Sequence, residues 1–304
     1  MPNEPTDLLQ RNLLALATHQ PELCERLSWP VSGERFVCDD QGLWTYRWRR
    51  APLAASLTPE LASELLEACD VGPRGLIFGV GAGELVAAAL ARDASSRWIA
   101  WDRDPWILRS ALGLHDWTAE LRSGRLELAL GPDLLDLCGL DQPRVEHPLM
   151  AQVYADERRL LEEGCGPLRA LVCTGELFVD SFCDALRDEG FGILPLEARH
   201  LSMEELDLVA RRFEPHLVAS INFVPGLPEF CEERGLDYLC WEIDPALDAP
   251  RLDGAATRTR VHTYRRANVA RFEEAGFEHV DYTPLAADPR RRRPLTLTLE
   301  EREH

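Results

Sequence analysis

The chain has 304 residues, of which 45% are hydrophobic and 28% charged, and its formal net charge is -19. This length favours two domains, and the composition is that of a folded globular protein rather than a disordered one. Because so acidic a surface repels phosphate backbones, the charge excludes a general nucleic-acid binder. No apolar run approaches the roughly 20 residues that span a bilayer, and residues 1–5 lack the features of a signal peptide, so we expect a cytoplasmic protein.

The nine cysteines are scattered, and no two of them are spaced as C-x-x-C. A disulfide framework or a zinc site needs paired spacing, so we expect reduced thiols and no metal site.

Residues 1–70 are predicted to form an extension of helices and a β-hairpin. Leucines at helical spacing indicate helices within 6–28, and strand-like runs at 35–38 and 43–48 flank a polar turn. Thr58-Pro59-Glu60 is typical of a helix start, with a capping side chain followed by proline.

Strands and helices alternate from residue 74 onward. Buried strands at 75–78, 98–101 and 126–130, separated by helices at 83–92 and 104–114, predict parallel pairing through right-handed crossovers. Residues 71–150 are therefore predicted to be a Rossmann-like domain, which forms domain one together with the extension.

A second series of the same kind follows a connection at 139–168, in which 151–168 is expected to be a linker helix. Its predicted strands lie at 170–173, 192–194, 217–221, 238–241, 260–264 and 279–282, and its predicted helices at 178–189, 203–213, 227–234 and 266–275. The fold class expected is therefore α/β, with two consecutive Rossmann-like domains, the second spanning 169–289, and a tail or linker at 290–304.

A glycine-rich loop, Gly79-Val80-Gly81-Ala82-Gly83, separates a predicted strand from a predicted helix. Glycines there allow a ligand to approach the backbone amides at a helix N-terminus. NAD is disfavoured because Glu84 occupies the position of the third glycine in the dinucleotide fingerprint. The G-x-G-x-G spacing instead resembles motif I of S-adenosylmethionine-dependent methyltransferases.

Two acids agree with that resemblance. Asp102 ends the second strand, where an acid can bind ribose hydroxyls, and Asp133 follows the third strand, where methyltransferases commonly place an acid that contacts adenine. Ile77 departs from the pattern, since active methyltransferases usually carry an acid at that position. Two interpretations remain open: S-adenosylmethionine or another nucleotide binds at Gly79, Gly81 and Gly83, or the loop needs glycine only for packing.

The second series contains Trp241-Glu242-Ile243-Asp244-Pro245 and ends on Pro284-Leu285-Ala286-Ala287-Asp288-Pro289. With these segments, residues 169–289 resemble the N-terminal half of the CgeB-like (spore-maturation-protein-like) glycosyltransferases. The first domain and its N-terminal helix loosely resemble the motility accessory factors linked to flagellin glycosylation.

The CgeB-like resemblance implies a GT-B glycosyltransferase of which this chain supplies the acceptor-side half, acting in protein or cell-surface glycan glycosylation. The partners implied are a nucleotide-sugar donor half or partner domain and a glycan or protein acceptor. Because the donor half would follow residue 289, the isolated chain is not expected to transfer sugar.

Ligands of open α/β sheets bind at the carboxyl ends of strands, where Asn222, Trp241, Glu242 and Asp244 all fall. Asp244 is the candidate general base and Glu242 the alternative. Asn222 and Trp241, with Gly175 and Glu176 at the first strand-to-helix turn, are candidate substrate-binding residues. A methyltransferase and a non-catalytic interaction module remain the alternative functions, because Rossmann-like domains carry many chemistries.

Overall fold

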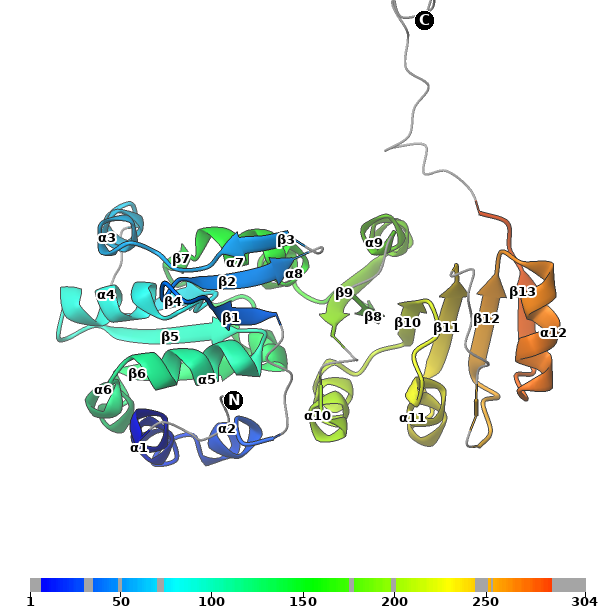
Figure 1. Ribbon diagram of the computed structural model, residues 1–304, viewed down its shortest axis with the longest axis horizontal. Helices are drawn as coiled ribbons and strands as arrows, with labels where there is room; N and C mark the ends of the chain where they lie inside the picture. The colour runs from blue at the N-terminus through cyan, green and yellow to red at the C-terminus, as the bar shows by residue number, and fades with distance from the viewer. Residues whose placement is uncertain are drawn as a thin grey trace, which may run out of the picture. The chain divides into compact units, whose positions relative to one another are not determined.

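The computed structural model describes residues 7–29, 35–48, 51–69, 74–174, 178–197, 201–243, 251–252 and 254–285. The chain forms two compact units: Met1–Leu171 with Gly190–Pro215, and Val172–Glu189 with His216–His304. Both belong to the α/β class, and the predicted pair of Rossmann-like domains with parallel sheets and a small N-terminal extension is confirmed (Figure 1).

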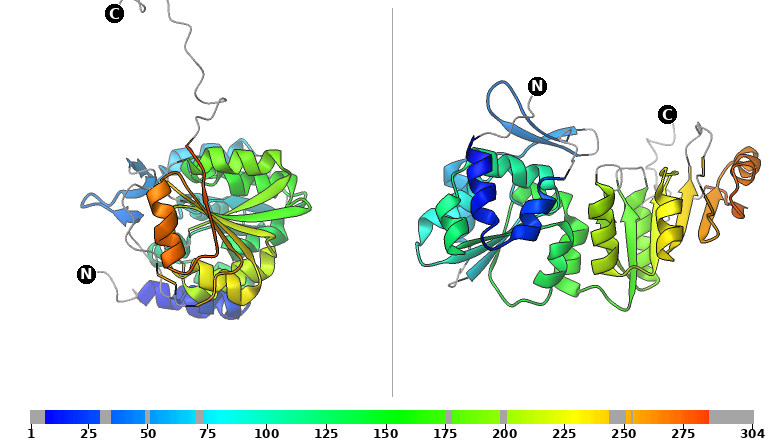
Figure 2. Two further views of the ribbon diagram at one scale, coloured as in Figure 1. Left: turned by 90° about the vertical axis from the view of Figure 1, so that its right-hand side faces the viewer. Right: turned by 90° about the horizontal axis from the view of Figure 1, so that it is seen from below.

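The first unit begins with the extension. Its elements are α1 (Asp7–Leu16), α2 (Pro21–Arg26), β1 (Phe36–Cys38), β2 (Trp44–Trp48), β3 (Ala51–Ala54) and α3 (Pro59–Glu67). The predicted hairpin is confirmed, since β1 and β2 pair antiparallel, and β3 adds a third strand that the sequence pattern did not indicate (Figure 2). The predicted start of α3 is also confirmed, because the Thr58 side chain accepts a hydrogen bond from the Leu61 amide.

A four-stranded parallel sheet of order β6-β5-β4-β7 forms the centre of the first unit. The elements from here are β4 (Arg74–Phe78), α4 (Glu84–Arg92), β5 (Arg97–Asp102), α5 (Pro105–Leu114), α6 (Thr118–Ser123), β6 (Leu126–Leu130), the 3₁₀ helix η1 (Gly131–Leu137), β7 (Arg144–Glu146), α7 (Pro148–Val153) and α8 (Ala155–Glu163). The two central strands, β4 and β5, are largely apolar and buried on both faces, as parallel strands covered by helices must be. The stretch 139–168, expected to be a connection, thus supplies a strand to this sheet.

Aromatic packing fixes the carboxyl ends of the central strands. The ring of Phe78, at the end of β4, stacks on Trp101 of β5 with centroids 4.7 Å apart. Tyr154, between α7 and α8, packs its edge against Trp101 at 5.4 Å. All three side chains are buried, so this cluster holds the strand ends and α8 in a defined position.

The second sheet has the order β13-β12-β11-β10-β8-β9, and the chain passes from the first unit to the second within β8. Its elements are β8 (Leu168–Cys173), α9 (Val179–Asp188), β9 (Phe191–Leu196), α10 (Met203–Phe213), β10 (Leu217–Ile221), α11 (Leu227–Arg234), β11 (Asp237–Glu242), β12 (Thr259–Thr263), α12 (Arg266–Glu274) and β13 (His279–Tyr282). Of these, β9 and α10 belong to the first unit. In the second, β10, β11, β12 and β13 pair in parallel, which places their carboxyl ends along one edge.

Candidate functional site

The glycine loop connects β4 to α4 as predicted. Gly79, Gly81 and Gly83 have φ values of 84°, 57° and 99°, a left-handed conformation that side chains other than glycine rarely adopt. The whole segment from Gly79 to Gly83 is buried. The loop therefore has the backbone of a ligand-binding turn but offers no open surface.

Side chains of the same unit occupy the space above this loop. A methyl group added at Gly79 would lie 2.3 Å from Cβ of Met150, and one added at Gly81 would lie 2.6 Å from Nε2 of His147. His115 covers Gly83 in the same way, at 2.6 Å. Burial lowers the pKa of His147 to about 4, so this imidazole is a neutral packing group at physiological pH.

Asp102, the predicted ribose ligand, is fully buried. Its carboxylate accepts hydrogen bonds from the amides of Val80 and Asp104, at 2.8 and 3.0 Å, and from the hydroxyl of Tyr154 at 2.7 Å. Burial raises the pKa of Asp102. This acid ties the glycine loop to β5 and leaves no accessible oxygen for a ribose.

Asp133, the predicted adenine contact, binds two arginines of the first unit. Arg26 donates from one nitrogen to both of its oxygens, at 2.8 and 2.9 Å, and Arg212 donates to one of them. The amide of Leu130 donates to the same carboxylate at 2.8 Å. Since the loop and both acids bind groups of the protein itself, the residues as placed do not fit S-adenosylmethionine, and the geometry favours the packing interpretation.

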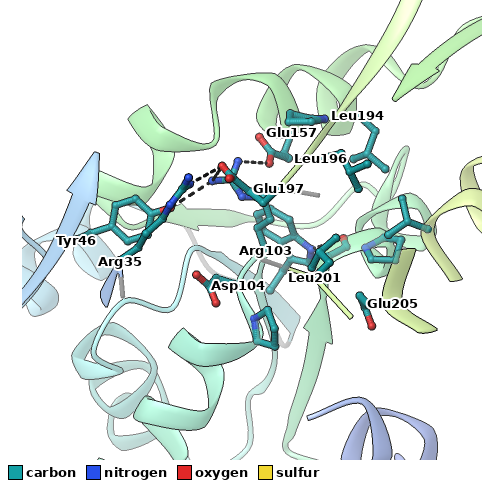
Figure 3. A pocket seen from close by; sticks show the side chains of 16 residues that line it. Arg35, Tyr46, Arg103, Asp104, Glu157, Leu194, Leu196, Glu197, Leu201 and Glu205 are labelled. Carbon is teal, nitrogen blue, oxygen red and sulfur yellow. Dashed lines mark hydrogen bonds and ion pairs between the residues drawn. The ribbon is translucent and has the colours of Figure 1, made fainter. Parts of the chain in front are cut away.

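A cavity elsewhere in the first unit is a candidate ligand-binding site. A cavity of about 50 Å³ lies beyond the carboxyl ends of β5 and β6, where Arg103, Asp104, Gly131 and Pro132 form part of its wall. Figure 3 shows Arg103 of this wall between Glu157 of α8 and Glu197 after β9. Arg103 binds Glu157 at 2.8 Å and Glu197 at 3.6 Å, and Arg35 binds Glu197 at 2.6 Å.

Two carboxyl groups on this wall titrate far from their usual range. Burial, reinforced by the neighbouring Asp102, raises the pKa of Asp104 to about 7. Burial also raises the pKa of Glu157 to about 7, although Arg103 favours its charged form. Sequence reasoning missed this site because its charged residues, from Arg35 to Glu205, come from segments far apart in the chain; the only local signal was Asp104, two residues after Asp102.

In the second unit, the structure brings Asn222, Trp241 and Glu242 together at neighbouring strand ends. Asn222 follows β10 with φ of 64°, and its side-chain oxygen accepts from the amide of Ile243 at 3.0 Å. Glu242, which is fully buried, accepts from the amide of Phe223 at 2.9 Å. These two side chains therefore cross-link the ends of β10 and β11.

Two buried polar atoms at the same edge lack a hydrogen-bond partner in the described part of the chain. They are Nε1 of Trp241, in β11, and Oγ1 of Thr174, which directly follows β8. The Trp241 ring is half-buried and lies 6.4 Å from the ring of Phe182 in α9. Gly175, Glu176 and Asp244 lie outside the described residues.

Among the described residues, no group of three or more histidine, cysteine or acidic side chains is arranged to hold a metal ion. Within the same ranges, no helix has the length and apolar character needed to cross a membrane.

Comparison with known proteins does not assign the chain to a family. No family model matches the chain, and no curated protein does. Among solved structures, a MAf glycosyltransferase from Magnetospirillum magneticum AMB-1 aligns with a TM-score of 0.34 and 12% identity, over 86% of this chain and 63% of that one. The chain thus spans less than two thirds of that structure, and a likeness at this score supports no conclusion about fold or function.

Proposed function

We propose that the chain is a glycosyltransferase-related protein, and that its second unit binds a sugar-bearing ligand at the carboxyl ends of β8, β10 and β11. The observation that carries the proposal is the indole of Trp241, whose buried N–H has no hydrogen-bond acceptor in the described part of the chain. A buried donor without a partner costs about 1–3 kcal/mol, so native proteins rarely keep one unless a ligand or water pairs with it.

The topology supports this location. From β8 the chain passes to β9 on one side and then returns to β10 on the other, so the strand order reverses between β8 and β10. Open α/β sheets bind ligands beside such a reversal, outside the carboxyl ends of the strands. Thr174 and Asn222 follow the two strands that flank it, and β11, which carries Trp241, is the next strand along.

The side chains at this edge suit a carbohydrate. A sugar ring offers an apolar face of C–H groups, which packs on aromatic rings, and hydroxyls that both donate and accept hydrogen bonds. Phe178, at the N-cap of α9, is 43% exposed, and the ring of Phe182 in the same helix lies 6.4 Å from the Trp241 ring.

Roles within this edge follow from the contacts. Glu242 is a positioning residue in this proposal, because its carboxylate is fully buried and binds the Phe223 amide. Asp244 remains the proposed general base of the family resemblance, and a CgeB-like assignment with a glycan or protein acceptor remains part of the proposal.

Ligand-observed saturation-transfer NMR on the full chain tests the proposal. The probes are methyl glycosides of common hexoses and N-acetylhexosamines, together with UDP- and CMP-linked sugars. We expect sugar protons of at least one probe to receive saturation. Trp241→Phe, which keeps an aromatic ring but removes the N–H donor and part of the ring surface, is expected to weaken that binding about fivefold or more, at least the value of one hydrogen bond.

Tyr282→Phe is the matched control, since Tyr282 is exposed at the end of β13, the outermost strand. This variant is expected to bind as the unsubstituted chain does. Absence of transfer to every sugar from folded protein, or equal binding by Trp241→Phe, would overturn the proposal.

A further inference from the structure

The cavity of the first unit is lined by more acidic than basic side chains. Its lining includes the cations Arg35 and Arg103 and the acids Asp104, Glu157, Glu197 and Glu205. Every lining residue belongs to the first unit.

Ion pairs compensate three of these acids. Glu197 pairs with Arg35, and Glu157 pairs with Arg103. Glu205 pairs with Arg26, at 2.7 Å, outside the lining. Within the described ranges, no cationic group lies at ion-pair distance from Asp104, and the carboxylate of Asp104 accepts a hydrogen bond from the Trp106 amide at 2.8 Å.

A second observation is independent of this charge balance. Glu157 is 1% exposed, and its Oε1 binds Arg103, whereas its Oε2 is buried and has no hydrogen-bond partner in the described part of the chain. A buried carboxylate oxygen is strongly disfavoured without a donor. Among the described residues, the wall of the cavity therefore carries one carboxyl group without an ion-pair partner and one carboxylate oxygen without a donor.

We propose that this cavity binds a primary alkylammonium group, with Asp104 and Glu157 as its carboxylate partners. An ammonium carries one positive charge and three N–H donors, so it can form an ion pair with Asp104 and donate a hydrogen bond to Oε2 of Glu157. A divalent metal fits less well, since no three acidic, histidine or cysteine groups in the described ranges converge to ligate one.

The apolar part of the lining and the volume of the cavity restrict the ligand further. Leu194, Leu196, Leu201 and Val209 line the cavity with hydrocarbon, which suits a short aliphatic stem behind the ammonium. A volume of about 50 Å³ admits a few water-sized groups, each of which needs roughly 10–15 Å³ by this measure. Nucleotides and other drug-sized ligands need about 300–1,000 Å³ and are excluded from the enclosed part.

Protons compete with such a ligand. Asp104 faces Asp102 and Arg103, and Glu157 faces Arg103 and Asp156, while Tyr46, Tyr154, Arg35 and Glu197 complete the charged and titratable surroundings. Because burial raises the pKa of both carboxyls to about 7, they are largely protonated in mildly acidic solution. Ammonium binding then requires loss of those protons, so affinity falls as the pH falls.

The test compares n-propylammonium chloride with 1-propanol and sodium propionate, at matched ionic strength, by saturation-transfer NMR on the full chain. We expect binding of propylammonium alone at about pH 8, and at least tenfold weaker binding at about pH 5.5, one to two units below the carboxyl pKa values. Asp104→Asn and Glu157→Gln are each expected to weaken binding about tenfold or more, since a charge-assisted hydrogen bond is worth about 1.5–3 kcal/mol.

Glu127→Gln is the matched control, because Glu127 is an exposed acid of β6 in the same unit, and it should leave binding within about twofold. Thermal melting verifies that each variant is folded. Should Glu157→Gln fail to fold, Asp104→Asn decides alone, since asparagine also caps a helix and keeps the amide contact. Equal binding of propylammonium and 1-propanol, full affinity of Asp104→Asn, or no signal with folded protein at about pH 8 would each overturn the proposal.

Discussion

Arg26 shows how a single side chain organises the first unit. It is buried, donates to Asp133 and Glu205, and also donates to the carbonyl of Leu130 at 2.9 Å. Three elements distant in sequence, α2, η1 and α10, thereby meet at one guanidinium. Arginine suits this position because its planar fork satisfies several acceptors in fixed directions.

Replacing Arg26 by methionine is expected to lower the free energy of unfolding by about 3–5 kcal/mol, because Glu205 would be left buried without its cation. Urea denaturation followed by circular dichroism measures the change. Arg11→Met is the control, since Arg11 pairs with Asp7 and Asp116 only at 3.9 and 3.6 Å on the exposed surface. Arg11→Met should lower the free energy of unfolding by less than about 1 kcal/mol. Similar losses for the two variants would contradict the role of Arg26 as the partner of buried acids.

Asp104 makes stability depend on pH in a defined direction. Its pKa in the folded chain is about 7, above the ordinary value of 3.8, so between these values the folded state binds a proton that the unfolded state releases. Stability contributed by this group is therefore complete below about pH 4 and is lost as the pH rises to about 7.

Asp104→Asn removes this dependence. The variant should unfold with nearly the unsubstituted free energy at about pH 4, and at about pH 8 it should be more stable by on the order of 2 kcal/mol, half of the full linkage value because the cavity admits water. Urea titrations at both pH values provide the measurement. A variant equally or less stable at the higher pH would show that Asp104 is not held near neutrality by its surroundings.

At the scale of elements, the glycine loop is a packing junction. Gly79 lies directly against Met150 of α7, and Asp102 of β5 holds the Val80 amide. The loop thus joins β4, β5 and α7 without the open cleft that a cofactor needs. This explains the glycines fully, since both the left-handed backbone and the close approach exclude a side chain.

Gly79→Ala is expected to destabilise the chain by about 3 kcal/mol or more, from the left-handed strain of about 1–2 kcal/mol together with the clash against Met150. Gly124→Ala separates the two causes, since Gly124 has φ of 68° but nothing within 4 Å of the added methyl group. Gly124→Ala should lower the free energy of unfolding only by the strain of the left-handed backbone, about 1–2 kcal/mol. Comparable losses in the two variants, measured by thermal or urea unfolding, would contradict the packing at Gly79.

The local elements were largely predictable. Alternating strands and helices, the hairpin at 39–42 and the Thr58 cap follow from short-range patterning, and the structure confirms them. The short β7 was missed because its three residues, Arg144–Glu146, carry no apolar run; it pairs with β4 only because the crossover places it there.

At the scale of the whole molecule, the two units differ in which polar groups remain available. In the first unit, both acids predicted to bind a cofactor are bonded to the protein itself. In the second, Trp241 and Thr174 retain unpaired buried atoms within the described ranges. Ligand recognition by the predicted residues is accordingly expected in the second unit.

S-adenosylmethionine and S-adenosylhomocysteine should therefore give no binding heat with the folded chain in isothermal titration calorimetry, at ligand concentrations up to the high micromolar range. The physical reason is that His147 and Met150 fill the space above the glycine loop. A saturable heat that Gly81→Val abolished would show instead that these side chains move aside for a cofactor.

The sequence alone determined the α/β class, the alternation of strands and helices from residue 74 onward, the parallel pairing and the glycine-rich turn after β4, because each depends on local periodicity and residue type. Only the tertiary structure decided what these elements expose. Whether Asp102 meets a ribose or Tyr154, and whether Arg103, Asp104 and Glu157 share a cavity, depends on side chains brought together from distant segments. Long-range packing sets burial and charge pairing, and those two quantities decide which carboxylates remain free to bind a ligand.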